Sequence, residues 1–144
     1  PGEIIGTIDY SPQNYLGEIY ANTNGGILGK ITENKKEFFT DKKISIAKKS
    51  EVKTGKAYLR SSISGKSKDY SIEIEKVFFH EKNPLKTLKI RVTDSELITL
   101  TGGIIQGLSG SPILQNGKLV GAVTHVLIDN PQMGYGIFAE SMLE

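Results

Sequence analysis

The sequence predicts an all-β fold, a barrel or sandwich of roughly seven to nine short strands with little helix. Short apolar runs of period two recur along the chain, and clusters of Gly, Ser, Asn and Pro separate them, which is typical of strands joined by turns. The composition is 38% hydrophobic and 24% charged over 144 residues, as in a globular domain with a single core. A second domain is therefore not expected.

The composition also limits the function classes. The chain has no cysteine, which excludes disulfides, zinc–cysteine sites and thiol nucleophiles. No apolar run approaches the ~20 residues that a membrane helix needs, and no signal peptide opens the chain. The chain starts at Pro1 without a methionine and already within an expected strand, which indicates a processed or truncated fragment.

Three strands are expected in the first third of the chain. They span Glu3 to Tyr10, Tyr15 to Ala21 and Ile27 to Ile31, because these runs alternate or cluster Ile, Leu and Tyr. Ser11-Pro12 and the segment Asn22 to Gly26 separate them as turns.

Residues 30 to 60 form the most basic part of the chain. They hold nine lysines and Arg60 against four carboxylates, for a local net charge of +6. This charge would be explained by a solvent-exposed face, or by edge strands whose lysines prevent pairing with the strands of other molecules. Nucleic acid is not the expected partner, because aromatic residues are not interleaved there as stacking platforms. An acidic peptide or an anionic membrane surface stays open as a partner.

The middle of the chain continues the period-two pattern. Strands are expected at Ile44 to Ile46, Gly55 to Arg60, Tyr70 to Phe79 and Leu88 to Val92. In the third of these, Tyr70, Ile72, Ile74 and Lys76 share one face, and Glu73, Glu75 and Val77 share the other.

One short helix is expected after the last of these strands. Thr93 or Asp94 can cap its start, and Thr101-Gly102-Gly103 ends it. Helix capping alone would explain why an aspartate occupies position 94.

A serine between glycines dominates the last third of the chain. Gly107-Leu108-Ser109-Gly110-Ser111-Pro112 predicts a sharp turn that projects the Ser109 hydroxyl outward and gathers backbone N–H groups, which can bind an oxyanion. An ordinary Gly/Ser/Pro loop is the alternative. Asn116-Gly117 then predicts a hairpin between a strand at Pro112 to Gln115 and a strand at Lys118 to Leu127.

This segment resembles a known family. The stretch TGGIIQGLSGSPILQNGKLVGAVTHV, from Thr101 to Val126, resembles the stage IV sporulation protein B (SpoIVB) serine peptidases, as do Asn130-Pro131 and Gly134 to Ile137. The sequence before Thr87 resembles the family only loosely. The resemblance implies a trypsin-like (chymotrypsin-type) β-barrel, here an incomplete or rearranged double barrel with one or two short helices.

The resemblance also implies site residues. Ser109 would be the nucleophile, and the N–H groups of Gly107 and Ser109 would form the oxyanion hole. Thr124, His125 and Val126 would form the strand that pairs with the substrate. Asp94 matches the acid that the family carries a short way before the nucleophile, and so competes with its capping role.

A serine nucleophile needs a base, and the family's base lies in a Gly-His motif upstream of the acid. This chain contains no Gly-His. Its two histidines are poor substitutes, because His80 lies in a polar turn and His125 on the substrate-side strand. Residues 1–144 are therefore expected to be the C-terminal part of a peptidase domain without the histidine segment and the family's PDZ domain, and inactive alone.

Two functions compete. The first is a SpoIVB-type serine endopeptidase that acts in sporulation signalling by cleaving a regulatory protein at the forespore membrane. The second is a catalytically silent β-barrel that binds peptides or regulates a partner. The resemblance implies an exported protein between the forespore and mother-cell membranes, in a membrane-associated regulatory complex and attached through a segment outside this chain. Pairing with another copy is also open, and no metal or cofactor is needed.

Overall fold

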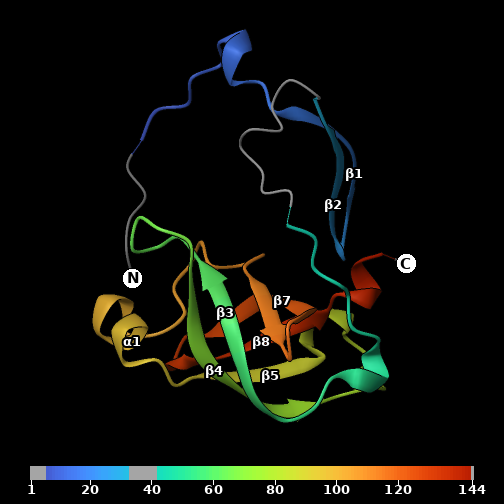
Figure 1. The fold of residues 1–144 in the computed structure, drawn as a ribbon, viewed down its shortest axis with the longest axis vertical. Coiled ribbons are helices and arrows are strands. Elements are labelled where there is room, and N and C mark those ends of the chain that lie inside the picture. Colours follow the sequence, from blue (N-terminus) through green and yellow to red (C-terminus); the bar gives the residue numbers. More distant parts are fainter. Residues whose placement is uncertain (1–5, 33–41, 144) are drawn as a thin grey trace. The chain divides into compact units, whose positions relative to one another are not determined.

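The computed structural model describes residues 6–32 and 42–143. The chain divides into two compact units, a hairpin unit within the residues up to Lys43 and a barrel unit from Ile44 onward (Figure 1). Among the described residues, no helix is long and apolar enough to span a membrane.

The hairpin unit is one antiparallel pair of strands. It contains a 3-10 turn, η1 (Pro12–Asn14), followed by β1 (Gly17–Thr23) and β2 (Gly26–Ile31). These strands confirm the second and third expected runs within two residues at each end. The first expected strand, Glu3 to Tyr10, is wrong over residues 6–10, which form no strand, and its remainder lies outside the described residues.

Six strands close the barrel unit in the order β3-β4-β5-β8-β7-β6, with every neighbouring pair antiparallel (Figure 1). The strands are β3 (Gly55–Ser61), β4 (Lys68–Val77), β5 (Leu88–Val92), β6 (Pro112–Gln115), β7 (Lys118–Leu127) and β8 (Asn130–Phe138). Closure comes from β3 and β6, where Tyr58 is paired with Leu114 and Leu59 with Ile113. The expected all-β barrel is therefore present.

Alternating side chains fill the barrel. Every strand contributes fully or almost fully buried residues, among them Ala57, Leu59, Tyr70, Ile72, Ile74, Leu88, Ile90, Ile113, Val120, Val123 and Phe138. Because barrel strands place successive side chains alternately inside and outside, this is the core that the period-two pattern predicts.

The short connections are 3-10 turns and one helix. The turns are η3 (Lys49–Glu51), η4 (Pro84–Lys86) and η5 (Glu140–Met142), and the helix is α1 (Ser95–Thr101). Asp94 caps the start of α1, and Gly102 ends it in the left-handed conformation at φ 75°. The expected short helix is confirmed with both of its boundary residues.

The nucleophile hairpin has the expected bounds. Asn116 and Gly117 both have positive φ, 51° and 74°, as a two-residue type I′ turn requires. This turn fixes the register of β6 on β7, and it therefore fixes where the preceding Ser109 turn meets β7.

Three expectations about strands need correction. Ile44 to Ile46 is not a strand but makes one isolated parallel bridge, Ile46 to Leu119. The expected strand Tyr70 to Phe79 ends at Val77, and a bulge between Ile74 and Lys76 breaks its alternation. Because the extra residue reverses the faces beyond it, Lys76 is exposed and Val77 packs against the core.

Candidate active site

The turn that carries Ser109 depends on glycine. Gly107 and Gly110 have φ of 102° and 88°, values that residues with a Cβ rarely adopt. Leu108 points inward and is 5% exposed, whereas Ser109 is exposed. The turn is thus anchored by one buried side chain and presents the serine to solvent.

Backbone hydrogen bonds tie this turn to β7. The Gly110 N–H donates to the Val123 carbonyl at 2.7 Å, and the Val123 N–H donates to the Ser111 carbonyl at 3.0 Å. The neighbouring residue, Thr124, lies at a bulge between Val123 and His125. A bulge redirects the backbone groups of the extra residue, and here the Thr124 carbonyl accepts a hydrogen bond from the Ser109 hydroxyl at 3.2 Å.

No base is hydrogen-bonded to Ser109. Its hydroxyl donates to the Thr124 carbonyl, and neither of the chain's two histidines shares a hydrogen bond with it. His80 lies in an exposed turn after β4. His125 lies on β7, and its Nδ1 is buried without a hydrogen-bond partner among the described residues. The Ser109 hydroxyl is thus bonded to a backbone carbonyl and not to a histidine.

The two N–H groups predicted to bind an oxyanion have no hydrogen-bond acceptor among the described residues. Neither the Gly107 N–H nor the Ser109 N–H donates a hydrogen bond to an acceptor in the part of the chain that the structure describes. Free backbone donors on a glycine turn beside a nucleophile are what an oxyanion hole requires.

A cavity of about 280 Å³ opens beside the serine. Its walls come from the segment before Ser109 and from the end of β7: Ile104, Ile105, Gln106, Gly107, Ser109, Thr124, His125, Val126 and Ile128. The structure therefore brings five of the six predicted site residues together, with Asp94 absent from this set. A larger hollow of about 610 Å³ on the β1–β2 hairpin contains none of them.

The β7 strand also has a free edge at this cavity. Its pairing with β6 extends only to Ala122, while its pairing with β8 continues to Leu127. From Thr124 to Leu127, β7 is thus paired on one side only among the described strands. An extended peptide can add to such an edge by backbone hydrogen bonds.

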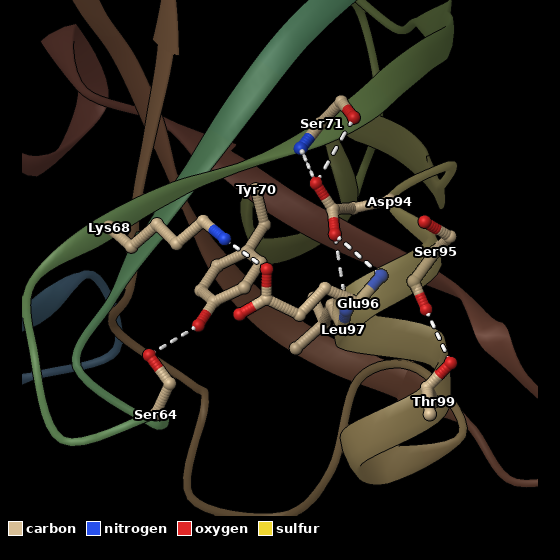
Figure 2. A network of polar contacts seen from close by, with 9 residues as sticks. All are labelled: Ser64, Lys68, Tyr70, Ser71, Asp94, Ser95, Glu96, Leu97 and Thr99. Atoms are coloured by element: carbon tan, nitrogen blue, oxygen red, sulfur yellow. Dashed lines mark hydrogen bonds and ion pairs between the residues drawn. The ribbon is translucent and has the colours of Figure 1, made fainter.

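Asp94 lies between α1 and β4 (Figure 2). Its Oδ1 accepts from the Glu96 and Leu97 N–H groups at 3.0 and 3.1 Å, and its Oδ2 accepts from the Ser71 N–H and hydroxyl at 3.2 and 3.3 Å. Burial raises the pKa of Asp94, but these hydrogen bonds outweigh burial and hold the pKa below its ordinary value. Both carboxylate oxygens are thus engaged in joining the helix to the strand.

The capping role of Asp94 is therefore observed, and its role as the acid of a triad stays a prediction. No hydrogen bond connects Asp94 to Ser109 or to either histidine. No local sequence signal identifies Ser71 as its partner, because that contact joins residues 23 positions apart.

The sequence matches the SpoIVB peptidase S55 family over residues 1–143. The chain belongs to this family of serine peptidases. No curated protein sequence matches it significantly.

Solved structures show the same trypsin-like fold. Two crystal structures of the Rv3671c protease of M. tuberculosis, an active and an inactive form, superpose with a TM-score of 0.59 at 18% and 17% identity. An inactive form of its serine-to-alanine mutant gives the same TM-score at 15% identity. Each match covers 88% of this chain, which spans only 55–63% of the length of those chains.

Several lining residues of this S55 chain were not expected from sequence. The cavity is also lined by residues for which no sequence motif predicts a role: Ile104, Ile105, Gln106 and Ile128. Three of these residues, Ile104 to Gln106, come directly before the Gly107 turn in the sequence. This position could have indicated that they lie beside Ser109, because residues that lead into a nucleophile turn lie next to it.

Proposed function

We propose that this S55 chain is the serine-bearing part of a serine endopeptidase. The observation that supports this most is the combination around Ser109. The serine is exposed on a glycine turn, with two free N–H groups beside it and the unpaired edge of β7 next to it. A peptide bound along β7 would have its carbonyl near the Ser109 hydroxyl and the two N–H groups.

In the proposed reaction, the Ser109 Oγ attacks the scissile carbonyl carbon and the bond to the leaving amine breaks. The N–H groups of Gly107 and Ser109 stabilise the negative charge on the carbonyl oxygen, and removing one such donor typically costs ~10²–10³ in turnover. The Ser109 hydroxyl must break its hydrogen bond to the Thr124 carbonyl and pass its proton to a base, which then gives that proton to the leaving amine. A water molecule, activated by the same base, would release the acyl group and restore the Ser109 hydroxyl. A histidine outside these 144 residues would supply that base, and Asp94 would be its acid.

Labelling with a serine-directed phosphonate tests this proposal. A longer protein that extends upstream and includes the family's Gly-His motif should be labelled at Ser109, as mass spectrometry of the digested protein would show. The Ser109→Ala variant of the longer protein is the control and should take up no label. If the folded longer protein resists labelling and cleaves no unfolded protein substrate, the peptidase proposal fails.

A catalytically silent peptide-binding barrel is the second candidate. Two observations favour it: the Ser109 hydroxyl is bonded to the Thr124 carbonyl, and both oxygens of Asp94 are occupied by capping partners. A longer protein that binds extended peptides but is not labelled by the phosphonate would identify this function.

The biological role proposed here follows from the family. The protein would act in sporulation signalling, between the forespore and mother-cell membranes, by cleaving a regulatory protein in a membrane-associated complex. In a spore-forming host, replacing the gene with the Ser109→Ala form should block sporulation and leave the uncut partner to accumulate. Normal spore yield with this variant would contradict the proposed role.

A further inference from the structure

We propose that the groove beside Ser109 selects substrates with an uncharged aliphatic side chain on the residue whose carbonyl is attacked. This inference rests on the proposed peptidase function and adds the substrate class. It follows from the apolar residues that line the groove, from the buried Ile104 among them, and from the lack of an Asp, Glu, Lys or Arg among its described lining residues.

The groove is longer than the cavity at Ser109 alone. A second hollow of about 280 Å³ adjoins it, lined by Thr101, Ile104, Ile105, Gln106, Val126, Leu127, Ile128 and Pro131. The two hollows share five lining residues, Ile104, Ile105, Gln106, Val126 and Ile128. They are therefore two parts of one groove that runs from Ser109 along the end of β7 to the start of β8.

Among the residues that the structure describes, those that line this groove include no Asp, Glu, Lys or Arg. Its titratable side chain is His125, whose Nδ1 is buried and unpartnered. A substrate lysine or arginine would thus meet no carboxylate among these lining residues, and a substrate aspartate or glutamate would meet no lysine or arginine. Burying an unpaired charge is unfavourable, whereas an aliphatic side chain gains from burial against isoleucine and valine.

Ile104 is the most deeply buried residue that lines the groove. This side chain is 2% exposed, and its Cδ1 lies only 2.7 Å from where a Cβ on Gly134 would be. The Ile104 N–H also donates to the Pro131 carbonyl at 2.7 Å, which fixes the backbone of this segment on β8. Glycine at position 134 thus lets Ile104 pack directly on β8, and the filled space limits how long a bound side chain can be.

Peptidyl phosphonates that differ only in the side chain next to phosphorus test the selectivity. On the longer, active protein, the valine and leucine probes should label Ser109 about 10–100 times faster than the lysine and glutamate probes. Equal rates, or fastest labelling by a charged probe, would overturn the inference. Failure of every probe would count against the peptidase function instead.

Binding of product-like peptides tests the side-chain selectivity separately from the peptidase function. Acetylated tripeptides that end in valine, lysine or glutamate carry a carboxylate that can accept from the Gly107 and Ser109 N–H groups without any base. In NMR titrations, the valine peptide should shift the amide signals of Val126 and Gly134 at the lowest concentration. If the lysine or glutamate peptide binds as well as the valine peptide, the inference is wrong, even if the protein is a silent barrel.

Two variants test the assigned residues. Gln106→Glu places a carboxylate at the exposed rim and should raise the lysine-to-valine rate ratio about tenfold. The matched control, Gln132→Glu, lies on β8 outside the lining set and should leave that ratio unchanged.

Ile104→Val should raise the leucine-to-valine ratio, because it lengthens the groove by a methyl group. A uniform loss with all probes would mean that Ile104 acts only in folding.

Discussion

At the scale of single residues, Ser109 and Ser111 lie two positions apart but have different surroundings. The Ser109 N–H is free and its hydroxyl is exposed, whereas the Ser111 N–H donates to Leu108 and its carbonyl accepts from Val123. Ser111 thus has its backbone bonded into the turn, and Ser109 has a backbone donor available for an oxyanion. This difference supports the assignment of Ser109 that the glycine spacing predicts.

We therefore expect different results from the two alanine variants of the longer protein. Ser109→Ala should abolish proteolysis, because the nucleophile is gone. Ser111→Ala should retain most of the activity, because its backbone hydrogen bonds do not depend on the hydroxyl. Rates of cleavage of an unfolded protein substrate would measure both. An active Ser109→Ala variant beside an inactive Ser111→Ala variant would reverse the assignment.

Asp94 should make folding stability depend on pH. Its folded pKa is depressed below the ordinary value of 3.8, so its stabilising hydrogen bonds are fully present above that value. As the pH falls below about 4 and through the folded pKa, protonation removes this stabilisation. The free energy of unfolding, from urea titrations across this pH range, should decline less steeply in Asp94→Asn. An identical decline in both proteins would mean that other groups dominate acid unfolding.

The same variant separates capping from catalysis. At neutral pH, Asp94→Asn should cost about 1 kcal/mol in unfolding free energy, because an amide cannot accept at both Ser71 and the helix N–H groups. Glu96→Gln, which removes the exposed ion pair with Lys68 and a negative charge in the first turn of α1, is the control and should cost less. If Asp94 is also the triad acid, turnover of the folded variant should fall by up to ~10⁴. Near-normal turnover would leave Asp94 with capping alone.

At the scale of elements, local sequence predicted the turns and the helix ends well. Asn116-Gly117 gave the correct turn, and Asp94 and Gly102 gave the correct ends of α1, because each acts through its own backbone geometry. The serine turn and the β7 strand beside it followed from the same kind of local signal.

Features that depend on the neighbouring strand were not predictable in this way. In β4, a bulge lies between Ile74 and Lys76, next to Glu73 and Glu75, which bind Arg91 of β5 at 2.6 and 2.9 Å. The period-two pattern of one strand gives no sign of a bulge, and it therefore predicts the wrong face for Lys76. The cavity walls were missed for the same reason, because they join β7 to the segment before Ser109.

The hairpin turn offers a prediction about stability. Gly117→Ala should lower the unfolding free energy by about 1–2 kcal/mol, because alanine at φ 74° is strained. Gly117→Asn is the matched variant and should cost less, since asparagine tolerates this conformation. Urea unfolding followed by circular dichroism would measure both. Equal losses in the two variants would indicate that the turn's conformation does not limit stability.

At the scale of the whole molecule, the sequence predicts the class of fold but not which strands form the barrel and which form a separate sheet. Six strands between Gly55 and Phe138 close into the barrel through the β3–β6 pair, which joins segments far apart in sequence. β1 and β2 form a sheet of their own. Period-two patterns identify strands in both units alike, so they cannot show which strands pair across such distances.

The closed barrel leads to a final prediction, that the 144-residue chain folds but has no peptidase activity. Barrel closure and a well-buried core do not depend on the catalytic base, so urea unfolding should be cooperative. Ser109 rests on the Thr124 carbonyl without a histidine bonded to it, and a serine hydroxyl is a weak nucleophile without a base. An oxyanion hole and binding groove alone leave a residual ~10³–10⁴-fold effect over water.

The decisive comparison incubates the short chain and the longer protein with the same serine-directed phosphonate. We expect Ser109 to be labelled in the longer protein and left unlabelled in the short chain, although unfolding curves show both to be folded. Labelling of the folded short chain at the rate of the longer protein would mean that it contains its own base. His125→Ala and His80→Ala would then identify it, with His125 tested first because it lines the cavity that contains Ser109.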